Sequence, residues 1–327
     1  MVNSEDLLGD INNIQAVAAI HKDTSTVEQS ASGGAFSALS HVLFAKGYAI
    51  YGVSFNDQLQ ALHTCATTKE ELDAFRKSKY VRSDTNGCFD DIRRRLHTGQ
   101  LVAFSGAPCQ NAALRRFWGE NTPQPLYIDL VCHGAPDPAL FGAYLRELGQ
   151  RHKDRVVGYQ FRDKTPHWGH INSRRARITF ASGKVKSTDL RTDPYLRAYY
   201  ARLGYRPACA ACPFATAARV SDISLADAWG IESLHPDMDP LRGVSLILLN
   251  TPKGHALRGE LAASMHMRPI PLDFAVANND QLRHATEFHP ENKRFYQLIQ
   301  SRGITGAVFA CVPRDTFFRR IRRRLRC

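Results

Sequence analysis

The chain has 327 residues, of which 43% are hydrophobic and 23% are charged, and its formal net charge is +12. This composition is typical of a globular protein and excludes disordered and collagen-like chains. No apolar run reaches the ~18 residues that a membrane-spanning helix needs, and residues 1–6 lack the pattern of a secretory signal. We therefore expect a cytoplasmic protein whose eight cysteines are thiols or metal ligands rather than disulfides.

Part of the positive charge lies in a basic tail, residues 319–327. Such a tail suits an acidic protein partner or an anionic membrane surface, and a solvated tail is the plain alternative. The other Lys and Arg residues are dispersed, and no nucleic-acid-binding motif is present. We expect no specific nucleic-acid partner.

The first motif is a glycine-rich segment near the N-terminus. Residues 1–24 show only weak helical patterning, and Ser32-Gly33-Gly34 then precedes apolar residues at helical spacing. The spacing predicts a helix over 35–45 with Ser32 as its N-cap. Two glycines at a helix start let another backbone approach, and the free N–H groups can face an anion. The segment is a phosphate cradle or a plain glycine-rich helix start.

Two strand–loop–helix units follow in succession. A strand over 101–104 leads through a loop to Cys109 and a helix over 110–118, and a strand over 126–131 leads to Cys132. The next helix starts at Asp137-Pro138, an N-cap followed by proline. This succession predicts parallel strands, with functional groups gathered at their carboxyl ends.

The second half of the chain is richer in antiparallel signals. A hairpin over 48–66 precedes the parallel units, and a further hairpin is expected over 177–186. The predicted class is mixed α/β, with parallel strand–loop–helix units and a more antiparallel, strand-rich second half. We expect the chain to divide into four regions. These are an N-terminal extension (1–26), a phosphate-loop region (27–104), a cysteine-bearing region (105–250) and a helical C-terminal extension with the basic tail (251–327).

Four cysteines are the strongest chemical signal. Cys109 and Cys132 each follow a strand, whereas Cys209 and Cys212 form a CxxC pair. Four thiolates suit zinc or an iron–sulfur cluster. Zinc sites commonly combine two CxxC-like pairs, so the single pair here favours a cluster. A redox dithiol is a third reading, although the thioredoxin pattern is missing.

The motifs in their order resemble the coenzyme F420 hydrogenase/dehydrogenase beta-subunit family. The resemblance runs over about 27–250 and implies an oxidoreductase with FAD and a [4Fe–4S] cluster, which passes electrons to a soluble acceptor or a deazaflavin-type coenzyme. The segments that carry it are Ser32-Gly33-Gly34, Ser78-Lys79-Tyr80, Gly106-Ala107-Pro108-Cys109-Gln110, Cys132-His133-Gly134, Phe161-Arg162-Asp163-Lys164, Cys209 to Cys212, Ser221-Asp222-Ile223 and Asp227-Ala228-Trp229-Gly230.

The chain departs from the family pattern in two respects. Many relatives carry an N-terminal ferredoxin-like segment, but residues 1–29 contain no cysteine, so the resemblance implies an external donor such as a ferredoxin or partner subunit. Ala226 stands where the family usually has Gly, and Ser105-Gly106-Ala107 where Gly-Thr is common. These changes remove no ligand.

The resemblance also implies roles for single residues. Cys109, Cys132, Cys209 and Cys212 would be the cluster ligands. Lys79 and His133 would be catalytic, although Lys79 could be a solvated lysine and His133 a packed one. Arg162 and Lys164 could instead pair with Asp163. The residues expected to bind cofactor are Ser32, Gly33, Gly34, Ser78, Lys79, Tyr80, Gly106, Gln110, Arg162 and Lys164.

Two hypotheses of different classes follow. The first is a FAD/[4Fe–4S] oxidoreductase acting on a small-molecule substrate, with an oligomeric state left open. The second is a cofactor-free or zinc-stapled accessory protein that uses its basic surface to bind an acidic partner.

Overall fold

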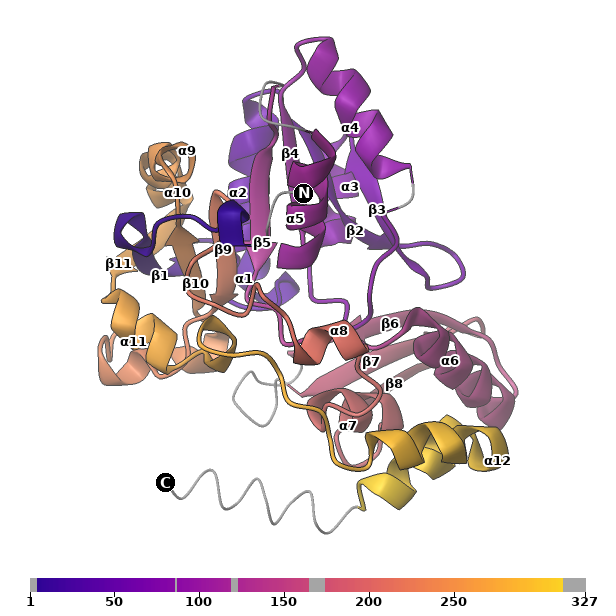
Figure 1. Cartoon of the computed structure of the whole chain (residues 1–327). Helices are drawn as coiled ribbons and strands as arrows, with labels where there is room; N and C mark the ends of the chain where they lie inside the picture. The colour runs from indigo at the N-terminus through magenta and orange to yellow at the C-terminus, as the bar shows by residue number, and fades with distance from the viewer. Residues whose placement is uncertain (1–4, 86, 119–122, 165–173, 314–327) are drawn as a thin grey trace.

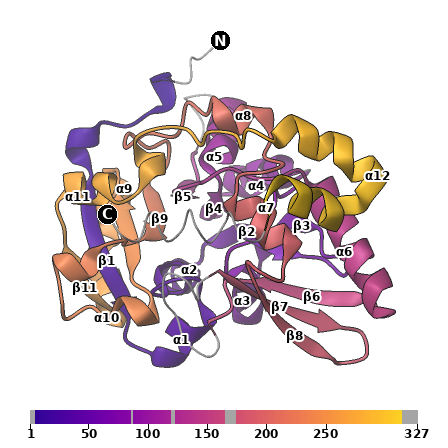
Figure 2. The same cartoon turned by 90° about the horizontal axis from the view of Figure 1, so that it is seen from below.

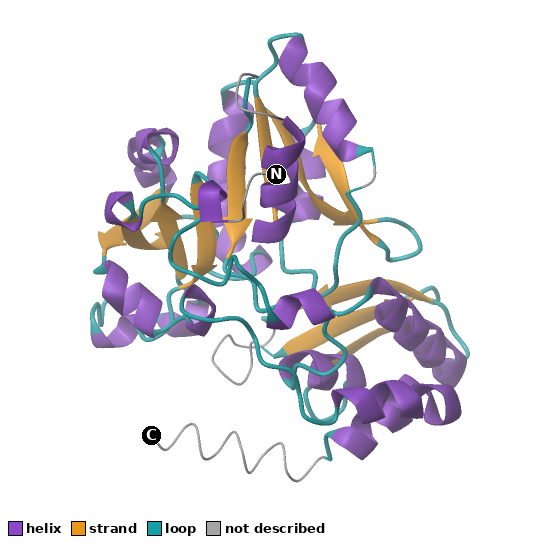
Figure 3. Ribbon diagram, viewed as in Figure 1, coloured by secondary structure: helices purple, strands orange, loops and turns teal. Residues whose placement is uncertain are grey.

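The computed structural model describes residues 5–85, 87–118, 123–164 and 174–313. The chain forms an eight-stranded sheet with helices on both faces, and a three-stranded sheet beside it (Figures 1 and 3). The strand order of the large sheet is β11-β1-β10-β9-β5-β4-β2-β3. Its strands are β1 (Gln15–His21), β2 (Ala49–Phe55), β3 (Ala61–Ala66), β4 (Val102–Gly106), β5 (Leu126–Leu130), β9 (Ile223–Asp227), β10 (Ser245–Leu249) and β11 (Met265–Pro269).

The centre of the large sheet is parallel. β2, β4, β5 and β9 pair in parallel, and antiparallel strands complete both edges. A parallel pair needs a crossover, which α5 (Pro108–Trp118) supplies between β4 and β5. The predicted mixed α/β class is confirmed, and so is the hairpin of β2 and β3.

Helices cover both faces of this sheet because its strands alternate their apolar side chains. Ile50 of β2 packs with α2 (Ala35–Ala45), α3 (Lys69–Phe75) and α10 (Arg258–Ser264). The next residue, Tyr51, packs on the opposite face with α4 (Cys88–His97) and α5. Successive side chains of a strand point to opposite faces, so two buried faces require two helical layers.

The small sheet consists of β6 (Val156–Phe161), β7 (Arg175–Phe180) and β8 (Val185–Asp189), all antiparallel. It packs with α6 (Pro138–His152), α7 (Pro194–Tyr200) and α12 (Asn292–Cys311), and Figure 2 shows α12 beside α6 and α7. The predicted helix start at Asp137 is confirmed, since its carboxylate accepts a hydrogen bond from Ala139 N at 2.8 Å. The predicted hairpin of β7 and β8 is also confirmed.

The short helices lie around the sheets. The one over Pro207–Ala210, α8, follows Arg206, whose N donates to Ala135 O in the loop after β5. The remaining helices are α1 (Thr24–Gln29), α8 (Pro207–Ala210), α9 (Pro252–Ala256) and α11 (Leu272–Ala277).

The helical patterning expected for residues 1–24 is wrong where β1 forms. This segment reads Gln-Ala-Val-Ala-Ala-Ile-His, and alanine has the highest intrinsic helix propensity. In the fold, β1 pairs on one side with β10 and on the other with β11, and Ala16 to Ala19 are buried. Pairing on both sides outweighs propensity, because small side chains fit a strand that is covered on both faces. β11 likewise brings the mostly helical C-terminal region into the same sheet.

The basic tail, residues 319–327, lies outside the described residues, so its role stays a prediction. Among the helices that the structure describes, none is both long enough and apolar enough to cross a membrane.

Gly33 offers a test of why glycine precedes α2. Its carbonyl accepts a hydrogen bond from His21 N at 2.7 Å, and an added Cβ would overlap Ala19 O and lie 2.8 Å from Ser245 N. We expect Gly33→Ala to lower the free energy of unfolding by about 1–3 kcal/mol, as overpacking does. Urea denaturation followed by circular dichroism measures this.

The matched control is Gly259→Ala in α10, where an added Cβ meets nothing within 4 Å. Alanine in a helix should raise the free energy of unfolding by roughly 0.5–1 kcal/mol. Equal effects of the two substitutions would show that the close approach at Gly33 does not constrain the fold.

Candidate metal and cofactor site

Three separate segments carry the four predicted ligand cysteines. Cys109 is the second residue of α5 and is exposed. Cys132 lies just beyond the end of β5, Cys209 lies in α8, and Cys212 follows that helix, each half-buried. The first two come from the carboxyl ends of neighbouring parallel strands, so the sheet brings their loops together.

Main-chain contacts join the CxxC segment to the loop after β5. Arg206 N donates to Ala135 O at 3.3 Å, and Pro136 forms an isolated bridge with Tyr205. Gly134 has a φ of +103°, and an added Cβ there would lie 3.3 Å from Cys209 Cβ. A glycine is therefore required where Cys132's loop meets the helix of Cys209.

A small apolar cluster joins the CxxC segment to α5. Cys212 packs against a buried group that contains Ala112, one turn beyond Cys109, together with Phe214 and Val220. The CxxC segment thus touches both of the strand–helix loops that carry the single cysteines.

The thiols are close enough to influence one another's protonation. Burial is the main cause that raises the pKa of Cys132 to about 12, and Cys109, Cys209 and Cys212 raise it further. Burial also raises the pKa of Cys212. Neighbouring thiolates repel, and a bound cation reverses this effect. Within the described residues, no group of three or more His, Cys, Asp or Glu side chains is arranged to hold a metal ion.

A buried arginine holds the cysteine-bearing segments in place. The side chain of Arg219 is 1% exposed, and it forms an ion pair of 2.9 Å with Asp129 of β5. Its guanidinium also donates four hydrogen bonds of 3.0–3.3 Å. The acceptors are Leu130 O near Cys132, Phe214 O and Thr216 O in the loop after Cys212, and Ser224 Oγ in β9. One side chain therefore ties β5, β9 and the loop after the CxxC pair together.

A second buried arginine joins the two sheets. Arg162 follows β6 with a φ of +57°, and its guanidinium makes a bidentate pair with Asp227, the last residue of β9, at 2.8 and 3.0 Å. Burial alone would lower the pKa of Arg162, but the Asp227 carboxylate outweighs it and the pKa is raised. Of the two predicted roles for Arg162, pairing with a carboxylate is observed, with Asp227 as partner. Asp163 lies 3.6 Å from Arg177.

His133 and Tyr80 lie around this pair. The side chain of His133 is reached by solvent, yet surrounding protein lowers its pKa, and the charges of Asp227 and Arg162 act on it. Tyr80 stacks on Tyr199 with ring centroids 4.0 Å apart, and the charge of Arg162 acts on its hydroxyl. The structure thus brings two predicted site residues to the Arg162–Asp227 pair.

Lys164 connects this centre to the glycine-rich segment. Its Nζ donates to Val27 O at 2.6 Å, to Ser32 O at 2.7 Å and to Arg242 O at 3.2 Å. Burial, and then the charge of Arg162, lowers the pKa of Lys164 to about 7. The ammonium therefore lies against the loop that the sequence predicts to hold phosphate.

The predicted N-cap role of Ser32 is wrong. The N-cap of α2 is Gly34, with a φ of +91°, whereas Ser32 Oγ donates to Val244 O at 2.9 Å. The backbone of Gly34 has a left-handed conformation. Ser32 therefore lies against the segment just before β10 instead of at the start of α2. The helix itself is confirmed over Ala35–Ala45.

The other predicted cofactor residues have structural contacts of their own. Lys79 Nζ donates to Ala74 O and Arg76 O, both at 2.8 Å, at the end of α3. Burial lowers the pKa of Lys79 to about 7. Its neighbour Ser78 is half-buried. Lys79 thus satisfies carbonyls at a helix C-terminus, and its predicted catalytic role stays a prediction.

Gln110 and Gly106 shape the loop before Cys109. Gln110 is buried, accepts a hydrogen bond from Ala107 N at 2.9 Å and donates to Ser83 Oγ at 3.0 Å. An added Cβ at Gly106 would lie 2.9 Å from Phe104 and 3.2 Å from His63 Nε2. These contacts set the course of the chain into α5.

Arg219 and the partner of Arg162 are not among the residues that the sequence motifs predict. One signal in the sequence is Asp129, a carboxylate inside the apolar strand Leu-Tyr-Ile-Asp-Leu, which indicates a buried ion pair. A carboxylate in a buried strand requires a cation, and a buried arginine requires a carboxylate. The partner's position along the chain is not encoded in any local pattern.

We expect Arg219→Met to destabilise the protein strongly. Methionine has neither a charge nor a donor, so Asp129 would be buried without its cation and the buried acceptors would lose their donor. Breaking a buried pair costs about 3–5 kcal/mol. Urea unfolding measures the loss, and Lys46→Ala, which breaks the exposed pair with Glu260, should change stability by less than about 1 kcal/mol.

Lys164 should make stability depend on pH in the alkaline range. Its folded pKa is about 7, whereas lysine in an unfolded chain titrates near 10.4. Between these values the unfolded chain holds a proton that the folded chain lacks, so the free energy of unfolding rises with pH from about 7 to about 10. Denaturation at pH 7 and pH 9 should show a smaller rise in Lys164→Met.

Lys79 has a pKa lowered in the same direction, so part of the rise should remain in that variant. Lys46→Met, at an exposed ion pair, should leave the rise unchanged. A rise of equal size in wild type and Lys164→Met would contradict the assignment.

The comparisons with known proteins agree with this architecture. The structure of the F420-reducing [NiFe] hydrogenase complex from Methanosarcina barkeri contains a chain that is 16% identical in sequence, with a TM-score of 0.54. The match covers 89% of the present chain and 99% of that one, and at this identity it shows a shared fold. No curated protein has a significant sequence match.

The family described as the C terminus of the coenzyme F420 hydrogenase/dehydrogenase beta subunit matches residues 99–271, more than half of the chain. The match includes all four cysteines, Arg162 and Asp227. The chain therefore belongs to the coenzyme F420 hydrogenase/dehydrogenase beta-subunit family, as its ordered motifs predict.

Proposed function

We propose that this protein is an iron–sulfur flavoprotein oxidoreductase with FAD and a [4Fe–4S] cluster. The electrostatic influence of Cys109, Cys209 and Cys212 on Cys132, in a family of hydrogenase and dehydrogenase subunits, is the observation that carries the proposal. When bound, the cluster supplies one-electron transfer and the flavin supplies hydride exchange with an organic substrate.

Cys109, Cys132, Cys209 and Cys212 would hold the cluster. Burial, and to a lesser extent the neighbouring thiols, raises the pKa of Cys132, so a cationic metal centre would stabilise the thiolates. Main-chain bonds and the buried Arg219 side chain connect the segments that carry Cys132 and Cys212.

Lys164, Arg162 and the Ser32-Gly33-Gly34 loop would hold the flavin cofactor. Lys164 Nζ lies 2.7 Å from Ser32 O and is influenced by Arg162, so positive charge is concentrated beside the loop. Such a charge suits a pyrophosphate. Tyr80 and Lys79 would contribute to the same side, as would Gly33 and Gly34 through close backbone approach.

His133 is suited to move a proton. Its side chain is solvent-exposed, it directly follows Cys132, and its pKa is lowered. An imidazole can accept and release a proton at a ring nitrogen. We assign His133 a proton-relay role at the flavin side of the cysteine site.

An external protein would supply or take the electrons. Cys109 is exposed, which gives a partner access to the cysteine site. We propose a cytoplasmic ferredoxin-type protein or a partner subunit for this role, and a small molecule or deazaflavin-type coenzyme as acceptor. The family description and the M. barkeri hydrogenase complex support this choice of partners.

Metal and flavin analysis of the anaerobically purified chain tests the proposal. We expect about four irons with sulfide, as for one [4Fe–4S] cluster, and bound FAD. Cys132→Ser should lose most of the iron, while Cys65→Ser, at a half-buried thiol of β3, should keep it. Visible absorption and iron assay measure both.

A colourless protein with stoichiometric zinc would instead support a zinc-stapled accessory protein. Iron content that is equal in wild type and Cys132→Ser would show that the ligand set is wrong. Circular dichroism of both variants separates loss of metal from loss of fold.

A further inference from the structure

A polar cavity of about 440 Å³ lies apart from the cysteines, between β1, β11, α1 and the loop over 237–242. It shares no lining residue with the four cysteines, the Arg162–Asp227 pair or the Ser32-Gly33-Gly34 loop. Its volume is within the range of about 300–1,000 Å³ found for small-molecule sites. We propose that this cavity binds a small organic anion, a phosphate or carboxylate attached to an apolar or ring-shaped body.

Two side chains with hydrogen-bond donors to spare line the cavity from different elements. Arg242 donates to Thr24 Oγ1 at 3.0 Å, and among the described residues this is the one hydrogen-bond partner of its guanidinium, which has five N–H donors. The imidazole of His266 makes no hydrogen bond within the described chain. These donors can therefore bind an oxyanion.

The acidic residues of the cavity are already engaged. Asp237 pairs with Arg268 at 2.9 Å, and Asp239 accepts from Leu241 N at 2.8 Å. Lys22 adds a positive charge while its Nζ donates to two carbonyls of α10. The lining thus contains three basic residues, Lys22, Arg242 and Arg268, and two carboxylates, one of which is paired with Arg268, so the cavity favours a negative ligand.

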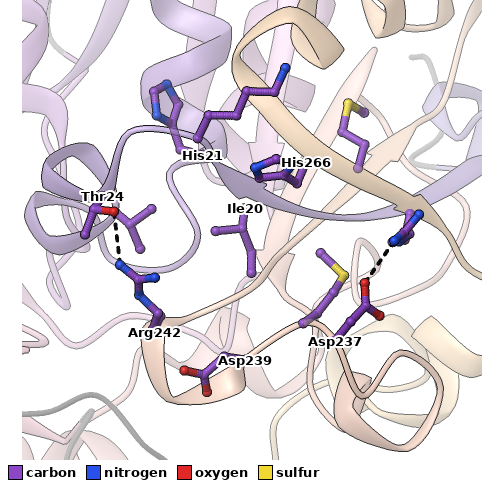
Figure 4. Close-up of a pocket in the computed structure, with 12 residues that line it drawn as sticks. Ile20, His21, Thr24, Asp237, Asp239, Arg242 and His266 are labelled. Carbon is purple, nitrogen blue, oxygen red and sulfur yellow. Dashed lines mark hydrogen bonds and ion pairs between the residues drawn. The ribbon is translucent and has the colours of Figure 1, made fainter.

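Apolar side chains form the remaining lining. Ile20, Val27, Met238 and Met267 line the cavity, and Met238 is only 3% exposed. Figure 4 shows Ile20 between the two histidines on one side and Arg242 and Asp239 on the other. An inorganic ion would leave this apolar surface uncovered, whereas a ligand with an apolar body would bury it.

The backbone of the cavity is held independently of its side chains. Lys164 Nζ bonds the carbonyls of Val27 and Arg242, two lining residues. A side-chain change at Arg242 leaves these bonds in place. The donors can therefore be removed one at a time without removing the wall that carries them.

Isothermal titration calorimetry of the full chain with phenyl phosphate and with benzoate tests the inference. Inorganic phosphate and benzyl alcohol serve as probes for charge alone and ring alone. We expect at least one of the two ring-bearing anions to bind about tenfold more tightly than both controls. Arg242→Gln and His266→Asn should each weaken that binding, Arg242→Gln by about tenfold or more. Arg93→Gln, which removes an exposed arginine of α4, should not.

If neither phenyl phosphate nor benzoate binds more tightly than inorganic phosphate, the site takes an adventitious ion only and the inference is overturned. Unchanged binding in both cavity variants would also overturn it. Flavin content is measured in parallel. Normal FAD content in Arg242→Gln, with lost anion binding, supports a separate site, whereas joint loss would assign the cavity to the flavin. If no variant contains flavin, the proposed function fails and the anion titration still decides this inference.

Discussion

The ion pair between Arg219 and Asp129 is the constraint on which the cysteine site depends. Both side chains are almost fully buried, so their charges are costly to remove from water unless each is well bonded. The guanidinium meets this cost by binding β5, β9 and the loop after Cys212 together. Three segments distant in sequence are thereby fixed beside one another, and two of them lead to or follow a predicted ligand, Cys132 and Cys212.

The Arg162–Asp227 pair performs a similar role between the two sheets. Asp227 ends a strand of the large sheet and Arg162 follows a strand of the small one, so this bidentate pair links the two sheets. The charges of this ion pair act on the nearby side chains of Tyr80, His133 and Lys164. The cofactor side of the proposed site is therefore built at the junction of the sheets, next to the loop of Cys132.

Several predicted cofactor residues also have definite structural contacts. Gly33 allows β1 to approach the loop, Lys79 binds the carbonyl end of α3, and Gln110 fastens the turn before α5. Such contacts are compatible with a binding role, because a cofactor loop must be held by the surrounding fold. Lys164 is an example, since it bonds both the glycine-rich loop and the wall of the polar cavity.

The sequence alone determined the helix over Ala35–Ala45, the start of α6 at Asp137, the hairpins and the family, because caps, periodicity and ordered motifs are local signals. Only the tertiary structure decided that residues 15–21 form a strand, that Gly34 caps α2, and that Arg219 and Arg162 pair with Asp129 and Asp227. These outcomes depend on partners far away along the chain. Pairing and burial energies there exceed the local preferences that a sequence displays.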